Sequence, residues 1–370
     1  MRVLGLCSYP VESAATRYRL AQFVASLAEK DINLEISPFL DSRQFALLYQ
    51  NKSLFEKVFG LAKPIFRRLS EISKIRRYDA LLVQREAMIF GPAFFEWIFR
   101  KFGRLPMILD LDDATYISYE SPTYGKIGSF LKFFGKTDKL IENAQVVICG
   151  NSFIAEYVRS KGTKAVVIPT VVETDVFCPV ERNNEPPVIG WIGTHSTFPF
   201  LESLFPVLQK LAEKHEFLLK IVGAGRENIT LEGVRIENLN WNLEREVADF
   251  QSLDIGLYPI QTAKSAPPEW ILGKSGFKAI QYLAVGIPFV VTPIGMCAEI
   301  GVPGETHFNA QSSEEWYNSL NKLLSDTALR KKMGARGRHY ALQNFTVPKQ
   351  AEILAKILRG IDKTGDKSNA

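Results

Sequence analysis

The sequence predicts an α/β protein made of two doubly wound domains. Short apolar runs alternate with amphipathic helical patterns along most of the 370 residues, as expected for parallel sheets covered by helices on both faces. The alternation stops at a proline-rich stretch and then begins again. A chain of this length has room for two hydrophobic cores and exceeds the usual size of one. We therefore expect two domains that face each other across a cleft, where ligands of such folds bind.

The first domain is expected over residues 1–169. Its strands are predicted at Val3–Cys7, Leu34–Pro38, Ala80–Val83, Met107–Leu111, Val146–Cys149 and Ala165–Ile168. Its helices are predicted at Thr16–Glu29, Pro64–Arg76, Pro92–Phe102, Ile127–Glu142 and Ser152–Arg159. Residues 170–187 follow as a linker, because this stretch is rich in proline, acidic residues and turn formers.

The second domain is expected over residues 188–345. Its strands are predicted at Val188–Ile192, Phe217–Val222, Val234–Ile236, Ile255–Tyr258 and Pro288–Val291. Its helices are predicted at Phe198–Lys214, Leu243–Gln251, Ser275–Val285, Ser313–Leu324 and Ala328–Asn344. A last amphipathic helix within residues 346–362 is expected to pack back toward the first domain. The polar tail 363–370 is expected to be disordered.

The composition narrows the class of protein. Hydrophobic residues make up 46% of the chain and charged residues 23%, which are the proportions of a folded globular protein. A formal net charge of +5 is too small over this length to indicate a nucleic-acid partner. The four cysteines lie far apart with no CxxC pair, which argues against disulfides and a structural zinc site. With no signal peptide and no long apolar run, we expect a cytoplasmic protein, in contact with the inner face of the membrane only peripherally.

One segment concentrates positive charge. Phe55–Arg77 carries seven Lys or Arg residues against two Glu, and its apolar residues Ile65, Phe66, Leu69 and Ile72 recur at helical spacing. A basic amphipathic helix of this kind can lie on an anionic membrane surface. The alternative is an ordinary helix docked on the domain with its charged face in solvent, and the sequence leaves both open.

The most informative stretch lies between two predicted strands of the second domain. Gly273–Pro288 (GKSGFKAIQYLAVGIP) is expected to open a helix at its glycines, and the free N–H groups and dipole of a helix start suit a diphosphate. Lys274 and Lys278 are four residues apart, which would place both cations on one helical face. Gln281 lies near the next turn, where its amide could hydrogen-bond sugar hydroxyls. Two solvated surface lysines are the alternative, which the glycines and the position beside the expected cleft disfavour.

This stretch resembles the donor-binding motif of the family-4 retaining glycosyltransferases and is closest to a bacterial subgroup with a GKxGFKxxQY motif. Other blocks follow the order of that family: TRYR at 16–19, QRE at 84–86, DLDD at 110–113, IPT at 168–170, GWIGTHST at 190–197, IVGAG at 221–225 and MGARGRHYALQNF at 333–345. The resemblance covers nearly the whole chain. It implies the GT-B fold of two Rossmann-like domains, a nucleotide-sugar donor, and metal-independent catalysis without a cofactor.

The chain departs from this family where relatives carry two glutamates separated by seven residues. The matching positions here are Gly273 and Gln281. The resemblance then gives Gln281 the ribose-contacting role as a neutral hydrogen-bonding group. Glu269 is the nearest acid that could contact a sugar hydroxyl, with a plain surface carboxylate as the alternative.

The chain also lacks the Arg and Lys that many relatives place after the first strand of the second domain, where no cation occurs before Lys210. The resemblance therefore assigns the diphosphate to Lys274, Lys278 and backbone N–H groups around Gly193 and Thr194. His195 is a weak further candidate in the same loop.

Acidic residues cluster in the first domain, where a buried strand ends in three acids within four residues. Such carboxylates are costly unless they are paired or functional. The family often has a histidine near this point, and the matching position is Asp112. Asp112 or Asp113 is therefore expected to orient the acceptor hydroxyl or accept its proton. A divalent metal on these acids is the lesser alternative, because the resemblance implies none.

Arginines near the predicted cleft are further candidates. Arg17 and Arg19 follow the first strand and could reach the donor phosphate or an anionic acceptor, with a pairing to nearby acids such as Glu12 as the alternative, and Arg17 is the favoured one of the two. Arg85 is followed by Glu86, with which it could form a salt bridge.

By this resemblance the protein is a hexosyltransferase that moves a sugar from a nucleotide-sugar to a hydroxyl of a carbohydrate or lipid-linked acceptor, with retention of configuration. Surface polysaccharide or glycolipid synthesis is the expected setting. The missing glutamates leave open a non-catalytic scaffold of a polysaccharide assembly system, and the fold also suits a nucleotide-sugar epimerase. A nicotinamide-dependent oxidoreductase is disfavoured, because no GxGxxG follows either domain's first strand.

Overall fold

The computed structural model describes residues 1–48, 62–118, 131–261 and 267–361. The chain divides into two compact units. Unit 1 comprises Met1–Thr170, Ala263–Ser275 and Val347–Ala370, and unit 2 comprises Val171–Thr262 and Gly276–Thr346. The predicted tail 363–370 lies outside the described residues, as does the 55–61 part of the basic segment.

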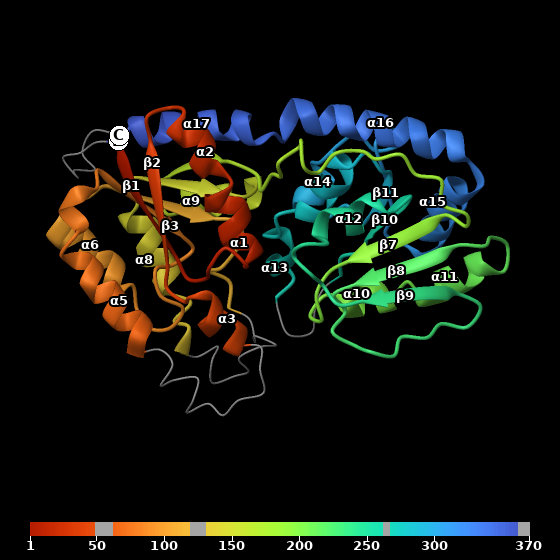
Figure 1. Cartoon of the computed structure of the whole chain (residues 1–370), viewed down its shortest axis with the longest axis horizontal. Helices are drawn as coiled ribbons and strands as arrows, with labels where there is room; N and C mark the ends of the chain where they lie inside the picture. Colours follow the sequence, from red (N-terminus) through yellow and green to blue (C-terminus); the bar gives the residue numbers. More distant parts are fainter. Residues whose placement is uncertain (49–61, 119–130, 262–266, 362–370) are drawn as a thin grey trace. The chain divides into compact units, whose positions relative to one another are not determined.

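Unit 1 is built on a six-stranded parallel sheet in the order β2-β1-β3-β4-β5-β6 (Figure 1). The strands are β1 (Arg2–Cys7), β2 (Asn33–Pro38), β3 (Ala80–Gln84), β4 (Met107–Leu111), β5 (Val146–Cys149) and β6 (Lys164–Val167). The helical segments are α1 (Ala14–Thr16), the π-helical turn η1 (Arg17–Ala21), α2 (Phe23–Ala28), α3 (Ser42–Leu48), α5 (Ala62–Ile72), η2 (Ile75–Arg77), α6 (Phe94–Gly103), α8 (Lys136–Asn143), α9 (Ser152–Ser160), α13 (Glu269–Leu272) and α17 (Val347–Arg359). The last helix, α17, packs against α2.

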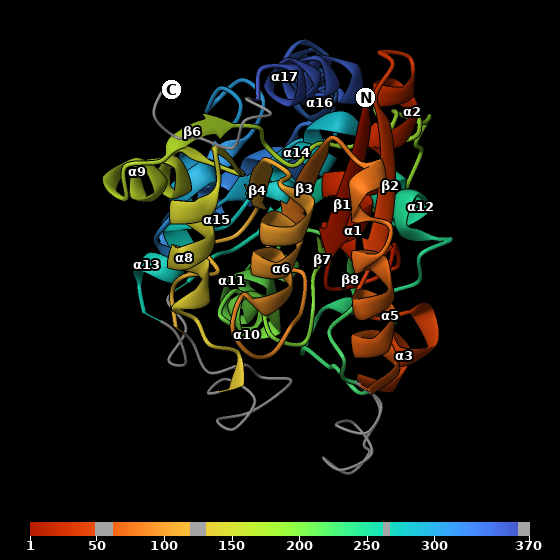
Figure 2. The same cartoon turned by 90° about the vertical axis from the view of Figure 1, so that its left-hand side faces the viewer.

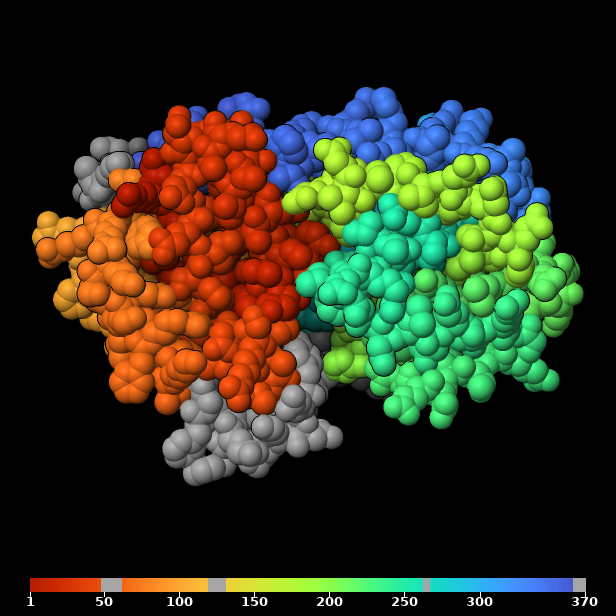
Figure 3. Space-filling model, viewed as in Figure 1, coloured from red at the N-terminus to blue at the C-terminus, as the bar shows by residue number. Residues whose placement is uncertain are grey.

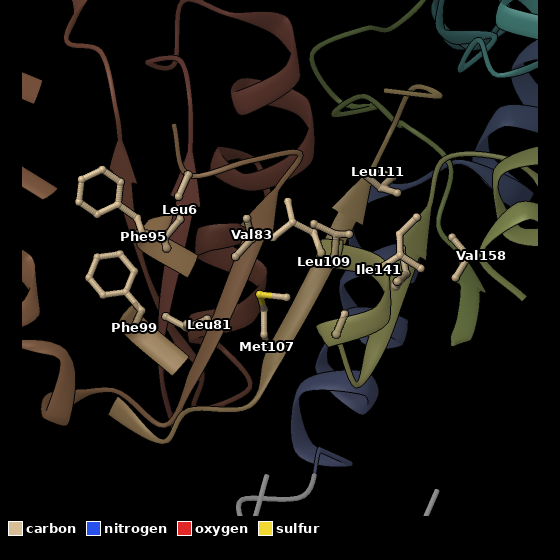
Figure 4. Close-up of a cluster of buried hydrophobic side chains, with 14 of the residues drawn as sticks. Leu6, Leu81, Val83, Phe95, Phe99, Met107, Leu109, Leu111, Ile141 and Val158 are labelled. Atoms are coloured by element: carbon tan, nitrogen blue, oxygen red, sulfur yellow. The ribbon is translucent and has the colours of Figure 1, made fainter. Parts of the chain in front are cut away.

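The core of unit 1 explains why its strands read as continuous apolar runs. A parallel sheet covered on both faces buries every side chain of its central strands, and all five residues of β3 and of β4 are buried. Leu81 and Val83 of β3 lie beside Leu109 of β4, and α6 adds the rings of Phe95 and Phe99 (Figure 4).

Unit 2 carries a second parallel sheet in the order β12-β11-β10-β7-β8-β9. Its strands are β7 (Val188–Ile192), β8 (Leu218–Val222), β9 (Arg235–Leu239), β10 (Ile255–Tyr258), β11 (Phe289–Val291) and β12 (Phe308–Asn309). Its helices are α10 (Phe198–Glu202), α11 (Phe205–Ala212), α12 (Glu246–Gln251), α14 (Phe277–Ala284), η3 (Gly295–Ala298), α15 (Ser313–Ser325) and α16 (Thr327–Asn344). The predicted α/β class with two doubly wound sheets is confirmed.

Several predicted helices are shorter than their patterns. The helix expected over Phe198–Lys214 is divided into α10 and α11, because Pro206 has no N–H to donate and starts a new helix. Of the helix expected over Ile127–Glu142, residues 127–130 lie outside the described residues, and α8 begins at Lys136, after Phe133 adopts a left-handed φ of 53° that no helix interior accepts. No helix in the described part of the chain is both long and apolar enough to cross a bilayer.

Candidate active site

Each sheet has one topological switch point. This is the place between two neighbouring strands from which the chain continues toward one edge of the sheet after one strand and toward the other edge after its neighbour. Open α/β sheets bind ligands at such a point, outside the carboxyl ends of the strands. In unit 1 it lies between β1 and β3, and in unit 2 between β7 and β10. The polar candidates of the sequence follow these strands or their neighbours, so each unit offers a site of its own.

In the unit 1 site, Arg19 pairs with the first acid after the middle of β4, Asp110. The arginine lies in η1 after β1 and is 3% exposed. Its Nε donates to Asp110 Oδ2 at 3.0 Å, a second nitrogen binds Asp110 Oδ1, and NH1 donates to the carbonyl of Ile168 at 2.7 Å. A bidentate guanidinium is the strongest partner available for a buried carboxylate. Arg19 therefore neutralises Asp110 and ties β4 to the end of β6.

Arg85 pairs with the other two acids of the unit 1 site, Asp112 and Asp113. Its Nε and NH2 donate to the two oxygens of Asp112 at 2.6 and 2.7 Å, and NH2 also reaches Asp113 Oδ2 at 2.8 Å. Gln84 adds a hydrogen bond to Asp112 Oδ1 at 3.1 Å. The salt bridge considered between Arg85 and Glu86 is wrong: Glu86 pairs instead with Lys136 at 2.7 Å.

These contacts give the two candidate acids, Asp112 and Asp113, different capacities to accept a proton or a hydrogen bond. Burial alone would raise the pKa of Asp112, but the charge and hydrogen bonds of Arg85 outweigh it and hold that pKa below its ordinary value. A carboxylate held in this way is a poor proton acceptor. Asp113 is 27% exposed, and within the described chain no group donates to its Oδ1. Asp113 is thus the better placed of the pair to meet a hydroxyl.

The negative charges of the three acids are balanced by arginines, because Asp110, Asp112 and Asp113 each contact one. No group of three His, Cys, Asp or Glu side chains in the described ranges is arranged to hold a metal ion. Arg17, expected to reach a phosphate, directs NH1 to the backbone carbonyls of Val11 and Glu12, each at 3.1 Å.

The stretch that includes Gly273 and Lys274 belongs to unit 1. Asn151 donates to the carbonyls of Leu272 and Lys274 at 3.2 and 3.0 Å. A Cβ at Gly273 would overlap that of Ala114, so glycine here allows close packing against the loop after β4. The Lys274 ammonium lies 3.6 Å from the ring centroid of Trp270 and 3.9 Å from Asp113 Oδ2. Lys274 thereby joins the acidic cluster of this unit.

The expectation that Lys274 and Lys278 share one helical face is therefore wrong. Helix α14 begins at Phe277, after Gly276 adopts a φ of 63° that breaks any helix coming from Gly273. Lys274 precedes the helix in unit 1, whereas Lys278 lies within it in unit 2. Glu269 is the first residue of the four-residue helix α13 and is exposed.

In unit 2, the loop that follows β7 begins with a glycine. Gly193 donates its N–H to Val222 at 3.0 Å, and a Cβ at Gly223 would overlap the Gly193 carbonyl. Thr194 donates its N–H to Thr197 Oγ1 at 3.1 Å. Both N–H groups expected to bind a diphosphate are therefore engaged. The next two, of His195 and Ser196, have no acceptor among the described residues, which places the available donors one to two residues further along the loop.

Helix α14 carries the charged and polar part of the unit 2 site. Lys278 Nζ donates to Gln281 Oε1 at 3.2 Å and lies 5.1 Å from the ring centroid of Phe250. Gln281 is fully buried, and its Nε2 has no acceptor in the described chain. A buried donor without a partner costs about 1–3 kcal/mol, which is unusual in a folded core. A ligand oxygen would satisfy it.

A cavity lies elsewhere in unit 2. It measures about 730 Å³ and is lined by Pro187, Asp254 and Pro288, which precede β7, β10 and β11. These residues mark the amino ends of the strands, the edge opposite Gly193. The cavity is therefore separate from the candidate site.

Comparison with known proteins gives a family match for part of the chain and similar folds for nearly all of it. Residues 181–340 match the family model of the glycosyl transferases group 1, and no match was found among the curated proteins. HepE of Anabaena, solved in complex with UDP, is similar over 98% of this chain and 100% of its own, with a TM-score of 0.67 and 16% identity.

Two further solved structures are similar over most of their length. Sucrose-phosphate synthase of Thermosynechococcus elongatus has a TM-score of 0.67 and 14% identity, over 97% of this chain and 98% of its own. A glycosyltransferase of Rickettsia africae has a TM-score of 0.68 and 17% identity, over 97% of this chain and 99% of its own. Residues 181–340 are therefore a glycosyl transferases group 1 domain, in a chain whose two parallel six-stranded sheets give it the GT-B fold.

Proposed function

We propose that this protein transfers a sugar from a nucleotide-sugar to an acceptor hydroxyl with retention of anomeric configuration. The observation that carries the proposal is the match of residues 181–340 to the glycosyl transferases group 1, because these residues include Gly193, Thr194, Lys278 and Gln281. The UDP and UDP-glucose complexes of HepE support a nucleotide-sugar donor.

Unit 2 is the proposed donor unit. The N–H groups of His195 and Ser196 supply hydrogen-bond donors for the diphosphate, and the Lys278 ammonium supplies positive charge. The departing diphosphate gains negative charge as the glycosidic bond breaks, so fixed donors and cations stabilise the transition state more than the ground state. In this proposal Gln281 donates its unsatisfied Nε2 hydrogen to a ribose hydroxyl.

Unit 1 is the proposed acceptor unit. Asp113 Oδ1 is the atom that accepts a hydrogen bond from the acceptor hydroxyl and orients its oxygen for attack. Lys274, 3.9 Å from Asp113 Oδ2, adds positive charge beside that carboxylate. Arg19 and Arg85 act as positioning residues, because they hold the end of β4 through Asp110 and Asp112.

The finer parts of the proposal rest on the family resemblance and on the residue types present. Retention is proposed without a nucleophilic residue, and no metal ion is assigned a step. The proposed acceptor is a carbohydrate or a lipid-linked saccharide of surface polysaccharide or glycolipid synthesis, at the cytoplasmic side of the membrane.

A donor–acceptor screen tests the proposal. The purified protein is incubated with UDP- and GDP-sugars, each with and without bacterial lipid and oligosaccharide extracts, and products are read by mass spectrometry. We expect a mass gain of one hexose on an acceptor, lost in Lys274→Ala and Lys278→Ala with the fold intact. Coupling constants of the product's anomeric proton test retention.

Two other outcomes would replace this function. A nucleotide-sugar altered in the absence of any acceptor would indicate an epimerase. Calorimetric titrations in which no nucleoside diphosphate binds would instead indicate a non-catalytic scaffold, the alternative raised by glycine and glutamine at the two glutamate positions.

A further inference from the structure

Helix α5 is anchored to unit 1 by an arginine. Arg68 has no exposed surface. Its guanidinium donates to the carbonyls of Cys7, Ser37 and Ala87 at 2.9, 2.8 and 3.1 Å, and it pairs with Glu71 at 2.9 Å. The helix is therefore docked on the unit through a charged residue, and most of the Lys and Arg side chains of residues 62–77 remain exposed.

Three apolar side chains of α5 nevertheless point away from the unit, whereas Ile72 packs against its core. Phe66 is 71% exposed, and Ile65 and Leu69 are 37% and 40% exposed. These are three of the four residues whose spacing predicted an apolar helix face. Grouped exposed apolar side chains on a folded chain mark an interaction surface.

Helix α6 continues this surface. Its inner face places Phe95 and Phe99 in the core, while Phe94, Trp97 and Phe102 are 47%, 51% and 58% exposed. The rings of Phe94 and Trp97 stack with centroids 6.5 Å apart. An aromatic pair is thus held in place on the outer side of the helix.

Helices α5, α6 and α8 lie side by side over one face of the sheet (Figure 2). Gly103, at the end of α6, packs against Ile75 just after α5, so these two helices end together. At the other end, Gly91 donates to the carbonyl of Leu131 at 2.9 Å, which brings the approach to α8 beside the start of α6. Leu131 and Phe133 are 41% and 50% exposed there.

We call this set of apolar residues the docking surface; those of α5 and α6 belong to the segment coloured orange in the space-filling view (Figure 3). Its members are Ile65, Phe66, Leu69, Phe94, Trp97, Phe102, Leu131 and Phe133.

Positive charges outnumber acids along the segments that carry the docking surface. Residues 62–77 hold six Lys or Arg and one acid, Glu71, which Arg68 already binds. Lys101 Nζ lies 4.8 Å from the centroid of the Trp97 ring, and Lys132 stands between Leu131 and Phe133 in sequence. The one acid of α6, Glu96, is buried and accepts the N–H of Ala87.

We propose that the docking surface binds the surface of an anionic lipid bilayer. Exposed aromatic rings favour the headgroup level of a bilayer, and lysines beside them attract anionic headgroups. This charge complementarity selects lipid over an apolar protein partner. The inference concerns unit 1 alone and does not depend on the proposed function, because binding needs no sugar donor.

Vesicle binding tests the proposal with the full chain. Vesicles of phosphatidylcholine alone are compared with vesicles containing 30 mol% phosphatidylglycerol, in about 0.1 M and about 0.5 M salt. We expect sedimentation only with the anionic vesicles, weakened at the higher salt. Lipids brominated on their acyl chains should quench tryptophan fluorescence in the wild type and not in Trp97→Phe.

Matched variants locate the surface. Phe66→Ser with Trp97→Ser should weaken binding about tenfold or more, through lost apolar burial. Lys63→Ser, Lys101→Ser and Lys132→Ser together should weaken it about a hundredfold. The control for charge is Arg235→Ser, Lys331→Ser and Lys332→Ser in unit 2, and the control for an exposed aromatic residue is Trp241→Ser. Arg68 is left intact, because its removal would unfold α5.

Both controls should bind as the wild type does, and near-ultraviolet circular dichroism should be unchanged in every variant. Equal binding to neutral and anionic vesicles, or equal losses in the unit 2 control, would overturn the proposal. Absence of vesicle binding together with self-association that Phe66→Ser abolishes would assign the surface to a second copy of the chain instead.

Discussion

Arg85 holds Asp112 through both carboxylate oxygens, at 2.6 and 2.7 Å, although 27 residues separate the pair. The contact links the end of β3 to the end of β4. It also fixes the loop that presents Asp113, whose Oδ2 accepts from the same guanidinium at 2.8 Å. The geometry of the proposed acceptor site therefore depends on this ion pair.

Arg85→Gln should destabilise the protein by about 3 kcal/mol, because a buried carboxylate loses its cation. The sign of the pH dependence should also change. In the wild type the depressed pKa of Asp112 gives stability that is present above its unfolded pKa, near 4, and is lost only as pH falls through the lower folded value.

In Arg85→Gln, burial dominates and raises that pKa, so the loss should instead appear as pH rises above 4. Urea denaturation at pH 4 and pH 7 measures both effects as differences from the wild type, and Arg85→Gln with Asp112→Asn should remove the part of the pH dependence that Asp112 contributes. An unchanged free energy of unfolding at pH 7 would contradict the assigned role of the pair.

Asp113→Asn should lower the rate of sugar transfer about a hundredfold or more while costing about 1 kcal/mol or less of stability. The amide keeps the shape of the side chain but loses the charge that orients a hydroxyl, and an exposed ion pair contributes little to folding. Asp138→Asn, which disrupts the pair with Lys161 at 2.8 Å, is the matched control. Initial rates that fall equally in both variants would argue against a role for Asp113 in the reaction.

Gln281→Leu should lower the affinity for a nucleoside diphosphate without lowering the stability of the fold. Leucine has a similar volume and removes the unsatisfied buried amide, so the free energy of unfolding should stay equal or increase by about 1 kcal/mol. Affinity for a nucleoside diphosphate should nevertheless fall about tenfold. Gln281→Glu loses the Nε2 donor, but its second carboxylate oxygen can accept from the same ribose hydroxyl, so it should keep most of that affinity; a loss as large as that in Gln281→Leu would count against ribose contact.

His307 should make unit 2 sensitive to acid. It is fully buried between Thr306 Oγ1 at 2.8 Å and Asn309 Oδ1 at 3.1 Å, and burial lowers its pKa from 6.5 to about 4. Between these values the unfolded chain binds a proton that the folded chain does not, so stability falls as pH drops from 6.5 to 4. The loss amounts to about 3 kcal/mol.

His307→Gln should remove this contribution. The measurement is the difference in free energy of unfolding between wild type and variant across pH 4 to 7, which cancels the effect of the carboxylates. A difference that does not change with pH would show that His307 titrates normally.

Most strands could be predicted because burial leaves a direct trace in the sequence. Met107–Leu111, Val146–Cys149 and Ile255–Tyr258 have the bounds expected, since each is a short apolar run between polar turns. The two-residue strand β12 is too short to give such a pattern. The division of Phe198–Lys214 was readable from Pro206, a signal that the helical periodicity obscured.

The site was less predictable because its decisive contacts are long-range. The acids at the end of β4 indicated that cations lie nearby. Only the sheet order shows that the arginines that pair with them follow β1 and β3. Lys274 and Lys278 were misplaced because the backbone of Gly276 turns left-handed between them. The outward apolar face of α5 depends on Arg68 and carbonyls up to 61 residues away.

The most direct test of the donor site is calorimetric titration of UDP, GDP and ADP into the wild type, Lys278→Ala and the control Lys210→Ala. We predict that one nucleotide binds the wild type and Lys210→Ala alike, and binds Lys278→Ala at least about tenfold more weakly, since one charged contact to phosphate is worth about 1.5–3 kcal/mol. If no nucleotide binds the wild type, or if Lys278→Ala binds as tightly as the control, Lys278 is not part of a nucleotide-sugar site.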